Sequence, residues 1–162
     1  MGNTQQGAVS FKNILILCVV LAVAGHFLPI LLGGNAAVRE EANFYGQEMN
    51  SATSDIAQAL RTGDRKNVVE LSRRIETAKN NIDQRKKVKL PRFRALALEG
   101  LSIDDEATLS LMRGESGTAL EKYMANKRLW LKKLCAYFDA PEKGLSVKDS
   151  EALEIAEACS KI

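Results

Sequence analysis

The residue types that could do chemistry are few and scattered in this chain of 162 residues. His26 is the only histidine, and it lies inside an uncharged apolar stretch. A histidine in that setting cannot complete a Ser/His/Asp or Cys/His arrangement with the polar remainder of the chain. Walker A, HExxH, CxxC and GxSxG motifs are all missing from the sequence. We therefore expect a protein that is not an enzyme and that holds no cofactor or metal.

An acidic triplet, Asp104-Asp105-Glu106, is the next group that could suggest a metal site or an acid–base pair. It follows Ser102, a residue type that caps helix N-termini through its side-chain oxygen. Acidic residues in the first turn of a helix complement the helix dipole. We interpret the triplet as the structural start of a helix.

Two cysteines, Cys135 and Cys159, form an even pair outside the apolar stretch that contains Cys18. An oxidising compartment could join such a pair as a disulfide. Two unrelated buried thiols would give the same sequence, so both interpretations stay open at this level.

Basic residues are concentrated in one part of the chain. Residues 65–94 hold eleven Lys or Arg and three acidic residues, whereas residues 95–121 hold one Arg and six acidic residues. The densest piece lies in residues 85–94. Its basic residues are Arg85, Lys86, Lys87, Lys89, Arg92 and Arg94.

Three roles compete for this basic piece. It could be a solvated face that pairs with the acidic segment, a site for anionic lipid headgroups, or a surface for an acidic protein partner. We expect no nucleic acid as a partner, because aromatic residues do not alternate with the basic ones as base stacking would need.

Residues 14–32 set the location of the protein. These nineteen positions carry no Asp, Glu, Lys or Arg, and a helix of that length spans roughly 28 Å, close to the thickness of the bilayer core. A cleaved signal peptide is the rival interpretation, but the apolar run is longer than a signal sequence needs. Lys12 precedes the run and a net negative group follows it, which favours an extracytoplasmic C-terminal part, periplasmic in a bacterium.

His26 and the small residues Ala22 and Gly25 predict a contact inside the membrane. Small residues allow close helix approach, and ionisable groups in a span usually face protein. We favour packing against a partner helix over ligation of a haem-type macrocycle, because the chain supplies no second ligand.

The residues that follow the apolar stretch must position any functional surface of the protein. Their apolar residues recur with the spacing of a helix nearly throughout. Two heptad seams, typical of a coiled coil, flank Thr62-Gly63-Asp64, a turn sequence. They predict an antiparallel hairpin that returns the basic piece toward the membrane. The seams are Val38, Ala42, Tyr45, Met49, Ala52, Ile56 and Ala59, then Val68, Leu71, Ile75, Ala78 and Ile82.

Further helices are expected downstream. Pro91 and Gly100 should break the chain before a short helix from Ser102 to Gly114. A capping box at residues 118–121 predicts a helix to about Phe138. Its expected inward stripe is Leu120, Tyr123, Met124, Trp130, Leu131, Leu134 and Phe138. Ser146 should begin a last helix that turns Leu153, Ala156 and Cys159 inward.

These observations predict an all-α protein with one N-terminal transmembrane helix, an antiparallel helical hairpin and a small C-terminal helical bundle. The expected divisions are residues 1–13, polar; 14–33, transmembrane; 36–90, hairpin; and 91–162, C-terminal subdomain. We expect an accessory or structural subunit of a membrane assembly, in contact with other membrane subunits or a second copy of itself. The alternative is a tethered periplasmic binding or inhibitory module.

Overall fold

The computed structural model is almost entirely helical, which confirms the all-α class. It describes residues 32–162 apart from residues 54, 63–66, 148–155 and 158. The elements are β1 (Leu32–Gly34), α2 (Ala36–Thr53), α3 (Ile56–Thr62), α4 (Val68–Asp83), α5 (Pro91–Arg113), α6 (Ser116–Asp139) and β2 (Leu145–Val147).

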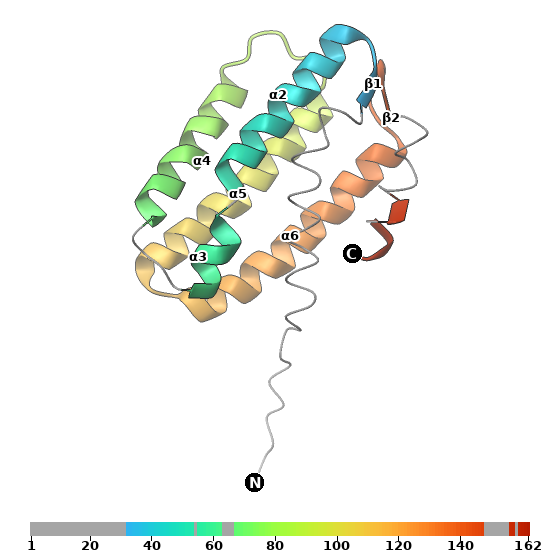
Figure 1. Ribbon diagram of the computed structural model, residues 1–162. Coiled ribbons are helices and arrows are strands. Elements are labelled where there is room, and N and C mark those ends of the chain that lie inside the picture. Colours follow the sequence, from blue (N-terminus) through green and yellow to red (C-terminus); the bar gives the residue numbers. More distant parts are fainter. Residues whose placement is uncertain (1–31, 54, 63–66, 148–155, 158) are drawn as a thin grey trace.

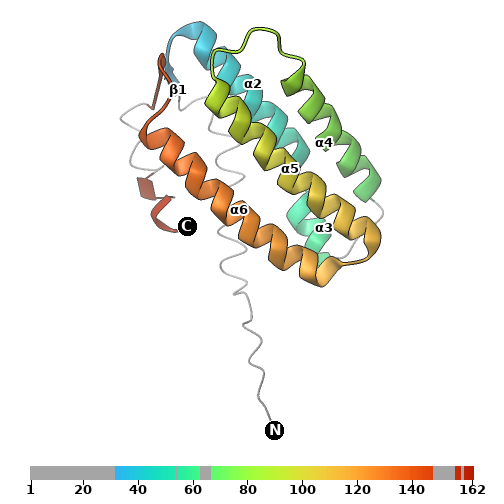
Figure 2. The ribbon, with the colours of Figure 1, turned by 180° about the vertical axis from the view of Figure 1, so that it is seen from behind.

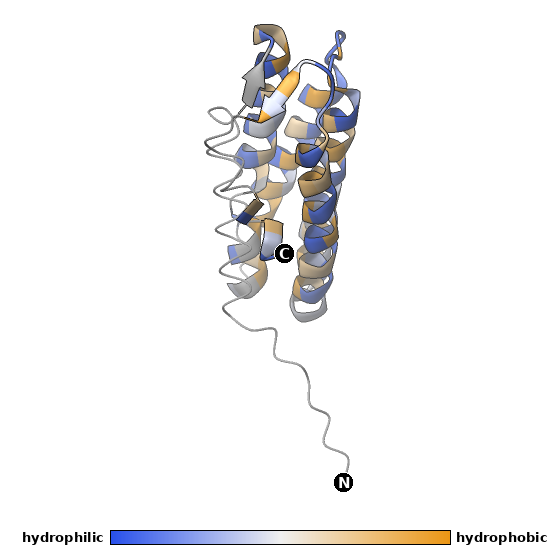
Figure 3. Cartoon of the chain, turned by 90° about the vertical axis from the view of Figure 1, so that its right-hand side faces the viewer, coloured by the Kyte–Doolittle hydropathy of each residue, from blue (hydrophilic) through white to orange (hydrophobic). Residues whose placement is uncertain are grey.

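The long helices run alongside one another with alternating directions. Helix α5 lies between α4 and α6, and α2 packs against both α4 and α5 (Figures 1 and 2). In Figure 3, hydrophilic and hydrophobic residues alternate along each helix. That is the pattern of amphipathic helices that bury one face. The described helices therefore form an antiparallel bundle around a shared core.

Helices α2 and α4 lie side by side, with the end of one opposite the start of the other. Asn81, late in α4, donates to Glu48 at 3.1 Å, and Arg74 pairs with Asp55, just after α2, at 2.9 Å. All twelve seam residues predicted from the heptads are buried. The predicted turn at residues 62–64 falls mostly outside the described residues, between the end of α3 and the start of α4.

The first helix of the hairpin is not continuous. The first heptad seam, from Val38 to Ala59, predicts one helix, but α2 ends at Thr53 and α3 begins at Ile56. Helix α3 packs against α5 and α6, so the change of direction carries Ile56 and Ala59 toward that side of the core. Heptad spacing alone does not reveal such a bend, because the apolar positions keep their period across it.

The break expected at Pro91 and Gly100 is not found, because both residues belong to helix α5. Pro91 is the first residue of the helix, where its missing N–H is no loss. Gly100 lies in the middle of the helix, and Ser102 is no cap, since its hydroxyl donates to Leu98 O one turn earlier. The helix does end as expected at Gly114, which adopts the left-handed conformation with φ +86°.

The capping predictions for the last helices are also wrong. Helix α6 begins at Ser116, two residues before the predicted cap, and the Thr118 hydroxyl donates to Glu115 O inside its first turn. Ser146 lies in strand β2. Ala156 is exposed, not turned inward, and Leu153 lies outside the described residues.

A short two-stranded sheet closes one end of the bundle. Strands β1 and β2 are antiparallel, with Leu32 opposite Val147 and Gly34 opposite Leu145. Asn35 N donates to Gly144 O at 3.0 Å, which ties the start of α2 to the loop after α6. The last two residues of the predicted 14–33 span are therefore extended, so a helical span has to end by residue 31.

Candidate interaction surface

The loop of residues 84–90 carries much of the predicted basic piece and joins α4 to α5 at the end of the bundle near β1 (Figure 1). We call it the basic loop. It begins where Gln84 N donates to Asn80 O at 2.9 Å, closing the last turn of α4. Its far end is Leu90, which precedes Pro91 and is fully buried.

A buried carboxylate from α2 holds the backbone of the basic loop. Glu41 has no exposed surface, and it accepts hydrogen bonds from Lys89 N at 3.0 Å and Leu90 N at 2.9 Å. It also accepts from the Tyr45 hydroxyl at 2.9 Å. Arg85 Nε lies 3.8 Å from the same carboxylate. A buried charge needs this number of partners to be tolerated.

Glu142, in the loop after α6, completes the cap on α5. Its carboxylate accepts from Arg92 N at 2.8 Å and Phe93 N at 3.1 Å, the next two free donors after Pro91. The first N–H groups of a helix have no partner within it, and the helix dipole attracts negative charge there. Two acidic residues from distant parts of the chain therefore fix the start of α5 and the basic loop before it.

Aromatic rings fill the space behind these caps. Phe93 stacks on Tyr137 with ring centroids 5.2 Å apart and meets Tyr45 edge-on at 6.0 Å. Burial raises the pKa of the Tyr45 hydroxyl, and its hydrogen bond to Glu41 adds to that shift. Burial likewise raises the pKa of Tyr137, which donates to Glu142 at 3.0 Å. Both phenols therefore stay protonated as donors.

The structure divides the six predicted basic residues into two groups. The arginines have internal partners. Arg94 pairs with Asp83 at 2.8 Å, Arg92 donates to Ala140 O at 3.2 Å, and Arg85 lies over the Phe44 ring, 4.9 Å from its centroid. The lysines Lys86, Lys87 and Lys89 are exposed, and their side chains form no ion pair with the described residues. Among these six residues, the three lysines are the ones whose side chains have no partner in the described part of the chain, although Arg92 is exposed as well.

The acidic triplet is not at a helix start, contrary to the sequence analysis. Asp104 lies in the middle of α5, fully buried, and pairs with the buried Lys127 of α6 at 2.8 Å. Lys127 also donates to Gly100 O at 3.2 Å and lies 4.7 Å from the Trp130 ring centroid. Burial raises the pKa of Asp104, and the charge of Lys127 opposes that shift. This pair joins helices α5 and α6.

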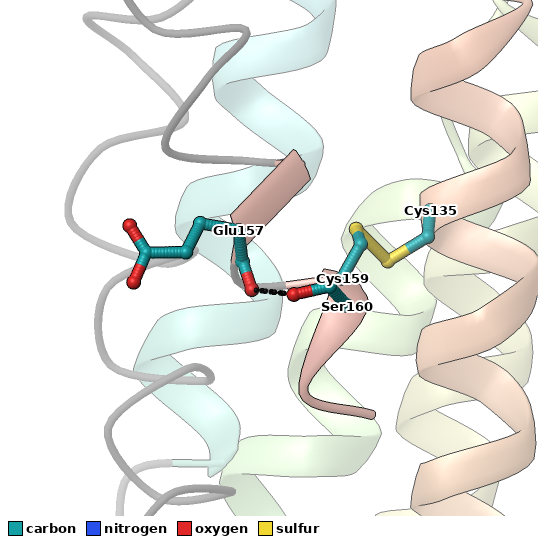
Figure 4. The surroundings of a disulfide bond; sticks show 4 residues. All are labelled: Cys135, Glu157, Cys159 and Ser160. Carbon is teal, nitrogen blue, oxygen red and sulfur yellow. Dashed lines mark hydrogen bonds between the residues drawn. A yellow bond between two sulfur atoms is a disulfide. The ribbon is translucent and has the colours of Figure 1, made fainter.

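The cysteine pair forms a disulfide. Cys135 of α6 and Cys159 of the C-terminal turn are bonded, with Cα atoms 6.0 Å apart (Figure 4). In that turn, the Ser160 hydroxyl donates to Glu157 O at 2.7 Å. The bond attaches the C-terminal segment to the end of α6 and favours the first of the two interpretations left open by the sequence.

The buried charges of the bundle were missed or misinterpreted from the sequence, although a signal for three of them exists. Glu41, Asp104 and Lys127 each lie three or four residues from apolar residues on a predicted or observed buried face. A charge at such a position has to be buried and paired. Glu142 offers no comparable signal, because it lies in a loop.

Other predicted features find no site in the described part of the chain. Ala22, Gly25 and His26 lie outside it. Among the described residues, no helix has the length and hydrophobicity needed to cross a bilayer. Within the same ranges no cluster of His, Cys, Asp or Glu is placed to hold a metal ion. A recess beside Ala107 and Tyr123 measures about 10 Å³, room for one water molecule.

Comparisons with protein-family models, curated proteins and solved structures find no match to this chain.

Proposed function

We propose that this chain is a single-pass membrane protein whose helical domain, on the extracytoplasmic side, is an accessory or structural subunit of a larger membrane assembly. The observation that carries the proposal is the apolar stretch before β1. Residues 14–31 contain no Asp, Glu, Lys or Arg. As a helix they would span roughly 27 Å, close to the thickness of the bilayer core.

The side chains in the proposed span support association with a partner helix as the role of this segment. A purely lipid-facing anchor needs only apolar residues, whereas this stretch includes His26 near the small residues Ala22 and Gly25. Small residues let a second helix approach closely, and a neutral imidazole can hydrogen-bond across the interface. These side chains therefore suit contact with a transmembrane helix of another subunit or of a second copy of this chain.

The helical domain fits binding to a partner better than catalysis. Its buried charges all have structural partners in the described residues, and its free charges are on the surface. The disulfide between Cys135 and Cys159 supports the extracytoplasmic side, because such bonds persist in oxidising compartments and are rare in the cytosol.

The test exchanges residues 14–31 for an unrelated apolar span of the same length. An assembly subunit should then lose its partners on mild-detergent purification by at least about tenfold, since close helix contacts depend on the replaced side chains. The exchanged chain should still resist alkaline extraction. The matched control replaces only Val19 and Val20 with Leu, which keeps the apolar length and leaves Ala22, Gly25 and His26 intact.

Three outcomes would contradict the proposal. Full recovery of partners after the exchange would favour the tethered binding or inhibitory module. Recovery of the mature chain in a water-soluble fraction, beginning near Ala37, would identify a cleaved signal peptide. Free thiols at Cys135 and Cys159 in intact cells, measured by alkylation before reduction, would count against the extracytoplasmic side.

A further inference from the structure

The basic loop presents three lysines without acidic partners at one end of the bundle. Lys86, Lys87 and Lys89 are exposed, while the arginines on either side are held by Glu41, Asp83 and Ala140. The loop backbone is fixed at Lys89 and Leu90 by Glu41. The backbone that carries these charges is therefore held in place. The buried Glu41 already accepts from three hydrogen-bond donors and forms an ion pair with Arg85.

The loop lies at the end of the bundle where the chain leaves strand β1 toward residues 14–31. Glu41, which binds the loop, is five residues beyond the start of α2, roughly 8 Å along the helix axis. Glu142 and Asn35 link the start of α5, the loop after α6 and the start of α2. Figure 3 shows the loop as mainly hydrophilic at the same end as the strands. A membrane that held residues 14–31 would therefore be close to these lysines.

We propose that the basic loop docks on an anionic phospholipid surface through Lys86, Lys87 and Lys89, and so fixes the orientation of the domain on the bilayer. This inference rests on the proposed membrane anchor. The ammonium group of lysine is a point charge on a flexible side chain. It can bind anionic headgroups, because that attraction requires charge but no fixed geometry. Each lysine near an anionic surface strengthens binding by about fivefold.

An acidic protein partner is the competing occupant, and the loop is poorly built for it. Protein interfaces depend on a few large apolar or aromatic anchors. The large apolar side chains exposed in the described residues, Val69, Leu109, Met112 and Leu129, belong to the helices and not to the loop. Val88, the apolar residue among the lysines, is half-buried.

The test reconstitutes the full chain into nanodiscs of phosphatidylcholine alone or with about one third phosphatidylglycerol, and follows amine labelling of the native lysines by mass spectrometry. Docking should slow labelling of Lys86, Lys87 and Lys89 by at least about fivefold in the anionic nanodiscs. Salt at about 0.5 M should restore the rate, because screening shortens the reach of the charges. Lys132, exposed on α6, should label equally in both lipids.

A pair of variants separates local docking from general charge. In the variant K86Q/K87Q, Lys89 serves as the reporter and should lose most of its protection. The matched control K132Q/K133Q removes two charges from α6, where Lys133 forms only an exposed pair with Glu99. In that control, Lys89 should stay protected.

Each contrary result has a separate meaning. Equal labelling in both lipids would overturn the docking inference and leave the anchor intact. Protection in native membranes but not in anionic nanodiscs would overturn it in favour of an acidic protein partner. Failure of the chain to enter nanodiscs at all, with loss on alkaline extraction, would overturn the proposed function itself.

Discussion

Charged residues on the apolar faces of the helices determine how this bundle is joined. Lys127 and Asp104 lie at buried positions of α6 and α5, and Glu41 lies on the buried face of α2. Each has partners from another element, so none is left as an isolated charge. Leaving one member of such a pair alone is more damaging than removing both, because the remaining charge stays buried.

Replacing Lys127 with Met should lower the free energy of unfolding by about 3–5 kcal/mol at neutral pH. The burial that raises the pKa of Asp104 would then act without the opposing charge of Lys127. A group with a raised pKa binds protons more readily in the folded state, so stability should rise as the pH falls from 7 toward 5. Urea unfolding at several pH values measures both effects.

Two further variants make the Lys127 prediction specific. Lys132→Met, on the exposed side of the same helix, should change stability by less than about 0.5 kcal/mol and show no added pH dependence. The double variant D104L/K127M should be more stable than K127M alone. A K127M variant with wild-type stability across this pH range would show that the pair is not buried as described.

At the scale of the element, helix α5 depends on a close approach at its middle. A Cβ atom on Gly100 would lie 2.8 Å from two carbon atoms of the Trp130 ring. Trp130 is held there because its indole N–H donates to Leu96 O at 2.7 Å. Glycine normally weakens a helix interior, but here its small size lets α5 and α6 meet.

We expect Gly100→Ala to destabilise the protein by about 1–2 kcal/mol, since overpacking against Trp130 outweighs the gain in helix propensity. Gly117 in α6 is the matched control, because a Cβ there meets nothing within 4 Å. Gly117→Ala should be neutral or stabilising by about 0.5 kcal/mol. Thermal melts of both variants would test this, and a stabilised G100A would refute the close packing.

At the scale of the whole molecule, the core is shared and not divided between the hairpin and the C-terminal helices. Buried residues from α2, α3, α4, α5, α6 and β2 belong to one cluster. The hairpin seams include Ala42, Ala52, Ala59 and Ala78, which bury little apolar area each. Phe93, Leu101 and Trp130 supply larger side chains from α5 and α6.

A fragment of residues 36–90 should therefore fail to fold on its own. Its circular dichroism should show weak helicity and a broad melt, because the hairpin lacks the α5 face against which α2 and α4 pack. A fragment of residues 32–162 should melt in one cooperative transition. Cooperative melting of residues 36–90 near the temperature of the longer fragment would instead establish the hairpin as an independent domain.

The amino-acid sequence alone determined the features that depend on local periodicity and on turn residues. The helical class and the buried residues of α2 and α4 follow from heptad spacing, and the end of α5 follows from Gly114. The apolar stretch and the clustering of basic residues are likewise visible without coordinates.

Only the tertiary structure decided which charges are free. Glu41 meets Leu90 across 49 residues of chain, Glu142 meets Arg92 across 50, and Lys127 meets Asp104 across 23. No local pattern contains such pairings, because they arise when separate helices desolvate one another and each buried charge has to find a partner. The same packing occupies Arg85, Arg92 and Arg94 and leaves the three lysines of the basic loop exposed.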